Sequence, residues 1–196
     1  YVGAYNNLGA LLNQLGEYKK SMNYYEKAIQ IQPNNANTYN NLGNLNKEIG
    51  EDQKAISFYE RAIQINPNHI VAYNNLGSTF KELGEHQKAI NCFEKVNQIQ
   101  PGNLTSHWKS MNVFPAIYRD LNEIERYRKR FENCIKKINR LLDRHSTFTK
   151  KQLINAIESS TNFFLHYQGK DDLELQKRYA QLIESITKKI YKEFDL

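Results

Sequence analysis

Cysteine, proline and tryptophan are scarce in this 196-residue sequence, which contains two, four and one of them. The two cysteines, Cys92 and Cys134, lie in different regions and form no CxxC pair. So few thiols suit a reducing compartment. We therefore expect a cytoplasmic protein in which each cysteine is a small apolar core residue.

Long apolar runs are also missing. No stretch approaches the roughly 18 residues that a membrane-spanning helix needs, and no signal peptide is visible. The sequence thus predicts no membrane contact. It begins at Tyr1, without an initiator methionine, inside what reads as a repeated unit. We therefore expect a fragment of a longer protein, with an unknown number of units upstream.

Signatures of catalysis are missing as well: the sequence has no HExxH, GxGxxG, P-loop or GxSxG pattern. The histidines, which show no metal-ligand spacing, are His69, His86, His107, His145 and His166. We predict no catalytic residue, no metal site and no cofactor in this chain. Only His166, beside Tyr167, invites a catalytic interpretation, and a partly buried structural histidine is the favoured alternative.

A period of 34 residues organises the first half of the chain. Several residue types recur at this spacing: Tyr5, Tyr39 and Tyr73; the doublets Asn6-Asn7, Asn40-Asn41 and Asn74-Asn75; Leu8, Leu42 and Leu76; Gly9, Gly43 and Gly77; Gly16, Gly50 and Gly84; and Pro33, Pro67 and Pro101. A fixed period of this length indicates a repeat array, in which neighbouring units bury a continuous core between them. The three copies span 2–35, 36–69 and 70–103.

Each copy has the pattern of two helices. In the first, Tyr5, Leu8, Leu12 and Leu15 follow helical spacing, and Gly16 then suits a left-handed backbone at the helix end. The second carries Met22, Tyr25, Ala28 and Ile29 and stops before Pro33. We predict that Gly9 allows the paired helices to approach closely, so that a larger residue there would overpack the contact.

These residues carry a family resemblance. The order Tyr-x-x-Leu-Gly, Gly, small-x-x-x-aromatic-x-x-Ala and Pro is similar to the tetratricopeptide repeat. In the second copy its residues are Tyr39, Leu42, Gly43, Gly50, Ala55, Tyr59, Ala62 and Pro67. Ser21 in copy one and Val96 in copy three depart from the expected alanine. The resemblance implies an all-α fold, a right-handed superhelix of helix pairs whose first helices line a concave, protein-binding groove.

The second half has different spacing. Residues 104–119 predict a capping helix, with Trp108 packed on the third copy, and then an irregular connector containing Pro115. Residues 120–196 predict a small bundle of three helices. Each helix has a capping-box pattern at its start: Asn122 with Glu125, Thr149 with Gln152, and Asp171 with Glu174.

A second resemblance concerns Phe114–Phe131 and Ser160–Ala180, in particular Phe114-Pro115, Tyr167-Gln168-Gly169 and Asp171-Asp172. These segments are similar to the linker between the repeats and the catalytic region in bacterial SPINDLY-type, O-GlcNAc-transferase-like proteins. The resemblance implies that the active site lies in a catalytic domain beyond Leu196. The chain itself would then be the part that recognises substrate.

Charge is unevenly spread. Residues 1–103 are neutral, and residues 104–196 carry the whole net charge of +6. One helix contributes a basic run of Arg126, Lys129, Arg130, Lys136, Lys137, Arg140 and Arg144. We interpret this run as a solvated charged face. Docking to an acidic domain and binding of nucleic acid are less favoured, because no strand carries the interleaved aromatic and basic residues of an RNA-binding module.

The recurring asparagines are the best functional signal in the sequence. A primary amide both donates and accepts hydrogen bonds, so a column of them can bind an extended backbone whatever its side chains. O-GlcNAc-transferase-like superhelices have such a ladder. The predicted groove residues are Asn6, Asn7, Asn13, Asn40, Asn41, Asn44, Lys47, Asn74, Asn75, Ser78 and Lys81. Which asparagine of each doublet faces the groove stays open, as does a purely structural role for the doublets.

The sequence therefore supports three hypotheses. The first is the recognition and linker part of a SPINDLY-like protein glycosyltransferase, the second a free-standing adaptor, and the third, the least favoured, a nucleic-acid-associated protein. In the first two the partner is a protein or an extended peptide.

Overall fold

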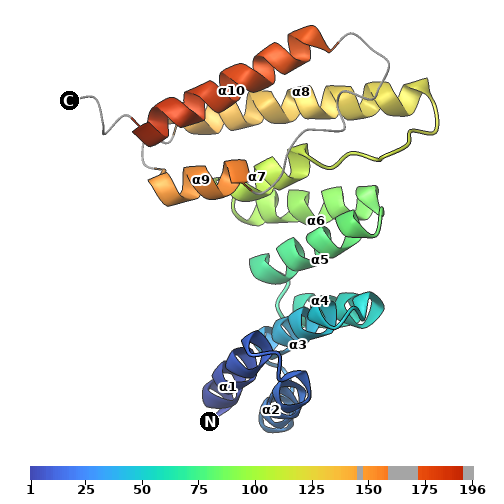
Figure 1. The fold of residues 1–196 in the computed structure, drawn as a ribbon, viewed down its shortest axis with the longest axis vertical. Coiled ribbons are helices and arrows are strands. Elements are labelled where there is room, and N and C mark those ends of the chain that lie inside the picture. The colour runs from blue at the N-terminus through green and yellow to red at the C-terminus, as the bar shows by residue number, and fades with distance from the viewer. Residues whose placement is uncertain (145–147, 159–171, 192–196) are drawn as a thin grey trace. The chain divides into compact units, whose positions relative to one another are not determined.

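The computed structural model describes residues 1–144, 148–158 and 172–191, and every regular element in this part of the chain is an α-helix (Figure 1). The all-α class is thereby confirmed. The helices are α1 (Val2–Gln14), α2 (Tyr18–Ile31), α3 (Ala36–Glu48), α4 (Asp52–Ile65), α5 (Ile70–Glu82), α6 (His86–Ile99), α7 (Leu104–Met111), α8 (Leu121–Arg144), α9 (Lys150–Glu158) and α10 (Leu173–Tyr191).

Contacts divide these helices between two compact units. The first is Tyr1–Cys92, and the second begins at Phe93, so the division falls inside α6. None of the described helices is long and apolar enough to cross a membrane.

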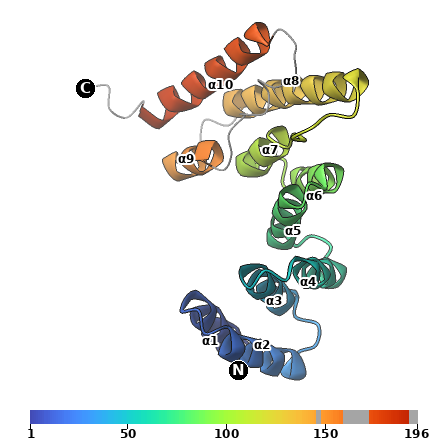
Figure 2. The same cartoon turned by 45° about the vertical axis from the view of Figure 1, so that its right-hand side comes forward.

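In the first unit, α1 packs on α2 and α3 packs on α4, and each of these pairs is joined by a tight turn (Figures 1 and 2). The turns contain the glycines that the sequence singled out. Gly16, Gly50 and Gly84 have φ values of 74°, 82° and 77°, a left-handed backbone that side chains with a Cβ rarely adopt. The prediction of glycine-terminated first helices is confirmed.

Close approach inside the helix pairs is confirmed as well. A Cβ added at Gly9 would lie 2.6 Å from the ring of Tyr25, and one added at Gly43 would collide with the ring of Tyr59. Ser21, the departure in copy one, fits at the same contact because its hydroxyl donates to the carbonyl of Gly9 at 2.8 Å. The Tyr rings thus fill the space that the glycines leave.

The core between the first two copies joins α2 to α3. Tyr25, Leu42 and Leu45 are buried together, with Met22 and Ile29 packed against them. The predicted apolar residues of α2 are therefore part of the core.

The predicted apolar face of α1 differs. Leu8 and Leu15 are 38% and 67% exposed, although Leu42, the equivalent of Leu8, is buried. Leu42 is covered by α2, whereas no described helix covers Leu8. The spacing thus predicted the face correctly but not its exposure.

The second unit is a bundle in which α7 packs on α8 and α9, and α10 packs on both α8 and α9. Trp108 of α7 is fully buried, and its ring centroid lies 5.8 Å from that of Tyr179 on α10. Phe131 of α8 lies 5.7 Å from the same tyrosine. Trp108 is therefore a core residue of this unit, and its predicted contact with the third copy stays a prediction. The predicted irregular connector separates α7 from α8.

Two of the three capping boxes can be compared with the structure. At α9, the Thr149 N–H donates to Gln152 at 2.8 Å and the Gln152 N–H donates back at 3.3 Å, which confirms the predicted pair. At α8 the prediction is wrong by two residues. Asp120, not Asn122, accepts from the Glu123 N–H at 2.7 Å. The same residue spacing fits both pairs, so sequence could not choose between them.

The basic run of α8 also needs a correction, because Arg130 does not belong to a solvated face. Its guanidinium donates to the carbonyls of Ser110, Met111 and Val113, at and just beyond the end of α7. It also stacks over Phe114, with 5.6 Å between the guanidinium carbon and the ring centroid. A cation at a helix C-terminus opposes the negative end of the helix dipole, so Arg130 caps α7.

Both cysteines are free thiols. Cys92 is buried, and burial raises its pKa to about 12. Cys134 is half-buried, and its pKa is also raised by burial. Some sequence predictions fall outside the described residues: those on His145, Phe164, His166, Tyr167, Gln168, Gly169 and Asp171.

Candidate functional site

The predicted groove residues all lie on the first helices of the three copies. On α1 they are Asn6, Asn7 and Asn13; on α3 they are Asn40, Asn41, Asn44 and Lys47; and on α5 they are Asn74, Asn75, Ser78 and Lys81. We call this set the amide face. Positions 34 apart are equivalent, so the set occupies the same side of each helix.

The two asparagines of each doublet differ in exposure. Asn6 and Asn40, the first members, are 9% and 5% exposed, whereas Asn7 is exposed and Asn41 half-buried. In copy three both Asn74 and Asn75 are half-buried. In the first two copies, therefore, the second asparagine is the one more open to solvent.

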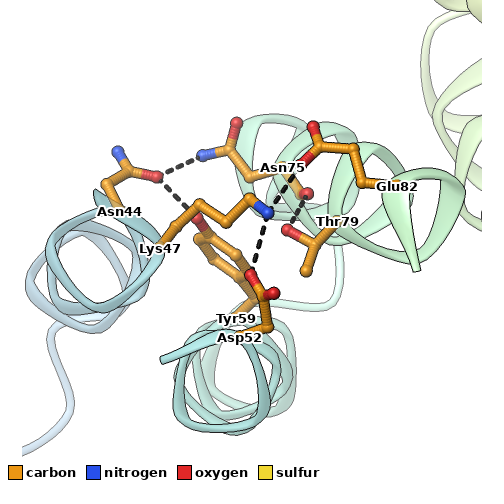
Figure 3. A network of polar contacts seen from close by, with 7 residues as sticks. All are labelled: Asn44, Lys47, Asp52, Tyr59, Asn75, Thr79 and Glu82. Carbon is orange, nitrogen blue, oxygen red and sulfur yellow. Dashed lines mark hydrogen bonds and ion pairs between the residues drawn. The ribbon is translucent and has the colours of Figure 1, made fainter. Parts of the chain in front are cut away.

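Hydrogen bonds connect the amides of neighbouring copies. The side-chain N–H₂ of Asn75 donates to the side-chain oxygens of Asn40 at 3.0 Å and Asn44 at 2.8 Å. The oxygen of Asn44 also accepts from the hydroxyl of Tyr59 at 2.9 Å (Figure 3). Helices α3, α4 and α5 are thus joined by one polar network, in which both N–H groups of Asn75 are used inside the protein.

Lys47 is held by the same network. Its ammonium lies 2.8 Å from a carboxylate oxygen of Asp52 and 2.6 Å from one of Glu82 (Figure 3). The hydrogen bonds that Lys47 donates to Asp52 and then to Glu82 raise the pKa of Lys47. Its positive charge is therefore matched within the protein.

Other amides keep an acceptor without a partner. The side-chain oxygens of Asn6, Asn13 and Asn74 are buried and accept no hydrogen bond from the described residues. A buried acceptor left unsatisfied costs about 1–3 kcal/mol, so a donor that reaches it gains that energy. The amide face thus combines an internally bonded part with three buried acceptors that have no partner among the described residues.

Sequence reasoning missed Tyr59 and Asp52 as parts of this site. Tyr59 had been assigned only to the repeat pattern, yet its hydroxyl reaches Asn44. The sequence held a signal at the position of Asn44. Copy two has asparagine there, whereas copy one has Ala10, whose side chain cannot accept such a bond. Asp52 gave no comparable signal, because a charge near a helix start has many possible partners.

Neither a metal site nor an enclosed ligand site is evident among these residues. Within the described chain no three His, Cys, Asp or Glu side chains gather as metal ligands. A cavity of about 400 Å³ lies between α8 and α10, lined by Glu125, Arg128, Lys129, Glu132, Glu174, Leu175 and Arg178. Several of these charges pair with one another, as Arg178 does with Glu174 at 3.0 Å. Because acidic and basic side chains alternate in its lining and pair with one another, the cavity does not present one sign of charge to a ligand.

Family models described as "Tetratricopeptide repeat" match residues 2–68 and 58–91. A solved structure described as "Crystal structure of MamA" is 26% identical, with a TM-score of 0.61, and the match covers 74% of this chain and 80% of that one. A second, "Crystal structure of MamA protein", is 17% identical, with a TM-score of 0.63, and covers 100% and 96%. No curated protein matches the chain.

Proposed function

Because residues 2–91 are tetratricopeptide repeats, we propose that this chain binds protein and takes an extended polypeptide on the amide face of α1, α3 and α5. The observation that carries the proposal is that amide oxygens on this face belong to side chains that reach the surface: Asn7 is exposed, and Asn41 is half-buried. An extended peptide presents a backbone N–H at every residue except proline, and each N–H can donate to such an oxygen. The ligand would thus be recognised mainly through its backbone.

The network around Asn75 gives this surface its rigidity. Since Asn75, Asn40 and Asn44 bond to one another, their amides are already oriented before a ligand arrives. Preorganised groups lose less conformational entropy on binding. The sequence had suggested that every amide would both donate to and accept from the peptide. Because both N–H groups of Asn75 are used inside the protein, that amide cannot also donate to the peptide.

The expected affinity is modest. A net hydrogen bond contributes about 0.5–1.5 kcal/mol, so three of them supply only part of a micromolar affinity. Side chains of the peptide must contribute the rest. Glu82, whose carboxylate is largely exposed although it contacts Lys47, is a candidate for meeting a basic ligand residue.

The test begins with a peptide ligand selected against the chain from a random 12-residue phage library. Asn7→Leu and Asn41→Leu keep the size of each side chain but remove the acceptor. We expect each to lower the affinity of the selected peptide about 2- to 12-fold in titration calorimetry, the equivalent of one hydrogen bond. Asn23→Leu on α2, exposed and outside the amide face, is the matched control and should leave affinity unchanged.

A chemical variant of the peptide separates backbone from side-chain recognition. N-methylation of the peptide backbone removes its N–H donors and leaves its side chains in place. If the proposal holds, methylation weakens binding more than alanine replacement of the side chains does. Affinity that survives both N-methylation and the two Asn→Leu variants would show that the amide face is structural.

The relation to SPINDLY-type glycosyltransferases stays a hypothesis from the sequence resemblance. The matching family models end at residue 91, and Tyr167-Gln168-Gly169 lie outside the described residues. A free-standing adaptor fits the same surface equally well, and the cytoplasmic location is likewise a prediction. The hypothesis that the chain binds nucleic acid loses support, because Arg130 donates to carbonyls within the protein and so contributes less to a basic surface on α8. A complete reading frame that continues into two Rossmann-like lobes would favour the glycosyltransferase.

A further inference from the structure

One side of α8 carries a row of basic side chains. Its members follow one another at steps of three and four residues, a spacing that places them on the same side of a helix. They are Arg126, Lys129, Asn133, Lys137, Arg140 and Arg144, and all of them are exposed. We call these residues the α8 row. The opposite side of α8 is buried through residues such as Phe131 and Ile138, so packing within the second unit turns the row toward solvent.

Most of the positive charge of the α8 row is unpaired. Arg126 lies 3.2 Å from Glu123, one turn away. No described residue forms an ion pair or a side-chain hydrogen bond with Lys129, Lys137, Arg140 or Arg144. Exposed lysines on other helices do have such a partner, as Lys54 has in Glu51 at 3.4 Å and Lys188 in Glu184 at 2.7 Å. The row therefore presents charge that the protein itself does not compensate.

The carboxylates of α8 lie beside the row and not within it. Glu125, Glu132 and Asp143 are seven and eleven residues apart, so helical spacing places them together along one flank. Glu132 is held there by Lys136 at 2.9 Å. From Lys129 to Arg144 the row extends for about 22 Å, at a rise of 1.5 Å per residue. The surface is thus a narrow positive line with a negative flank.

We propose that the α8 row binds an acidic helix of a partner protein. A helix is about 10 Å wide and can carry a single line of Asp and Glu residues at steps of three and four, the spacing of the row itself. Such a helix matches the row along its length and leaves the acidic flank free. The amide face takes no part in this contact, so it is independent of the peptide-binding function proposed above.

Nucleic acid fits this surface less well, although phosphate would be attracted to the same charges. A nucleic-acid strand carries phosphates along its whole backbone, and those that leave the narrow row would meet the carboxylates of Glu125 and Asp143, which are exposed. Binding of single strands also relies on aromatic side chains on which bases stack. The α8 row contains no aromatic residue.

Fluorescence anisotropy with labelled peptides and the whole chain tests the proposal. The probe is an alanine-based helical peptide of about 20 residues whose glutamates follow one another at steps of three and four and so lie on one side. A second peptide has the same composition, with its glutamates distributed around the helix. We expect the one-sided peptide to bind at least about fivefold more tightly. Its binding should weaken as sodium chloride is added, because salt screens exposed charges.

A triple variant of the chain tests the row directly. Lys137→Gln, Arg140→Gln and Arg144→Gln together remove unpaired charges and keep long side chains that favour a helix. We expect this variant to bind the one-sided peptide at least about fivefold more weakly than the parent does. The matched control combines Lys19→Gln, Lys20→Gln and Lys54→Gln, at exposed positions of the first unit. It loses the same charge and should bind as the parent does.

Circular dichroism of the parent and both variants reports whether the helices are retained. Absence of binding by the one-sided peptide overturns the proposal. Equal affinity for the two peptides, or an equal loss in the two variants, would show attraction between net charges only and would overturn it as well. A labelled single-stranded DNA of about 20 nucleotides that binds the parent more tightly than the peptide does, and the row variant more weakly, would assign the row to nucleic acid instead.

Discussion

The side-chain amide of Asn75 donates a hydrogen bond to the side-chain oxygen of Asn40, 3.0 Å away, and so joins α5 to α3 across the boundary between two repeats. A second bond from the same amide reaches Asn44. Stability of a repeat array is approximately a sum of terms within repeats and terms between neighbours. The two bonds of Asn75 contribute to the free energy of the contact between neighbouring repeats. They lie in the site where we also propose ligand binding.

Asn75→Ala should therefore destabilise the array. It removes both donors, and Asn40, which is buried, loses its only described partner, whereas Asn44 keeps the hydroxyl of Tyr59. We expect the free energy of unfolding to fall by about 1–3 kcal/mol in a urea titration. The equivalent Asn41→Ala in copy two, which breaks no bond of this kind in the structure, should cost clearly less. Equal losses in the two variants would show that the inter-repeat bonds contribute nothing.

Gly9→Ala tests the close approach of α1 and α2. A Cβ there would lie 2.6 Å from the ring of Tyr25, and overpacking of this kind typically costs about 1–3 kcal/mol. Gly3→Ala on the same helix is the matched control, since nothing lies within 4 Å of its added Cβ. Alanine is the better helix former, so the control should gain about 0.5–1 kcal/mol. Opposite shifts of the two thermal midpoints are the expected result, and a shift in the same direction contradicts it.

Helix positions and turn glycines could be predicted from the sequence because they depend on local periodicity. Gly16 and its equivalents fix the turns whatever surrounds them, and the spacing of Met22, Tyr25 and Ile29 defines a face without further information. The capping box at Thr149 was predicted for the same reason. At α8, Asp120 and Asn122 both fit the pattern, so local sequence offered two solutions.

Partners from distant helices could not be predicted in the same way. Periodicity assigns Leu8 to an apolar face, but burial of that face depends on whether another helix packs on it. The charge of Lys47 is matched by Asp52 on α4 and Glu82 on α5, a combination visible only in three dimensions. The sequence assigned Arg130 to the solvated face of its helix, because its contact with the carbonyls at the end of α7 depends on how two helices pack. The candidate site was thus located from sequence, while its donors and acceptors were not.

Arg130→Met should destabilise the second unit. Its guanidinium donates to three carbonyls at the end of α7. Those of Met111 and Val113 would lose this donor while methionine still fills the space, and that of Ser110 keeps a bond from the Val113 N–H at 3.4 Å. Each buried carbonyl left unpaired costs about 1–3 kcal/mol, and water can replace part of that loss. We expect a drop of at least about 2 kcal/mol in the free energy of unfolding, measured by urea titration. Lys129→Met, at the exposed neighbouring position, should change it by less than about 0.5 kcal/mol. Comparable stability of the two variants would show that Arg130 does not cap α7.

His69 makes the stability of the first unit depend on pH. It occupies the N-cap of α5, the position that Asn35 occupies on α3 and Asn103 on α7. Its ring nitrogen Nδ1 accepts from the Ala72 N–H at 3.1 Å. Because Nδ1 accepts, the neutral ring carries its proton on Nε2, which lies 3.0 Å from the side-chain oxygen of Asn37. Protonation of Nδ1 would remove the cap. The ring is also buried, and burial lowers its pKa below the ordinary value of 6.5.

The sign of the effect follows from that lowered pKa. The unfolded chain takes up the proton more readily than the folded one, so the contribution of His69 is complete above about pH 6.5 and is lost as the pH falls through the folded pKa. His69→Asn installs the asparagine cap found on α3 and α7, which does not titrate. Urea titrations at pH 7.5 and 5.0 should show a larger loss of stability on acidification for the parent than for the variant. Burial also lowers the pKa of His107, but this residue is present in both proteins. The difference between them therefore isolates His69. Identical losses in parent and variant would mean that the cap tolerates protonation of the ring.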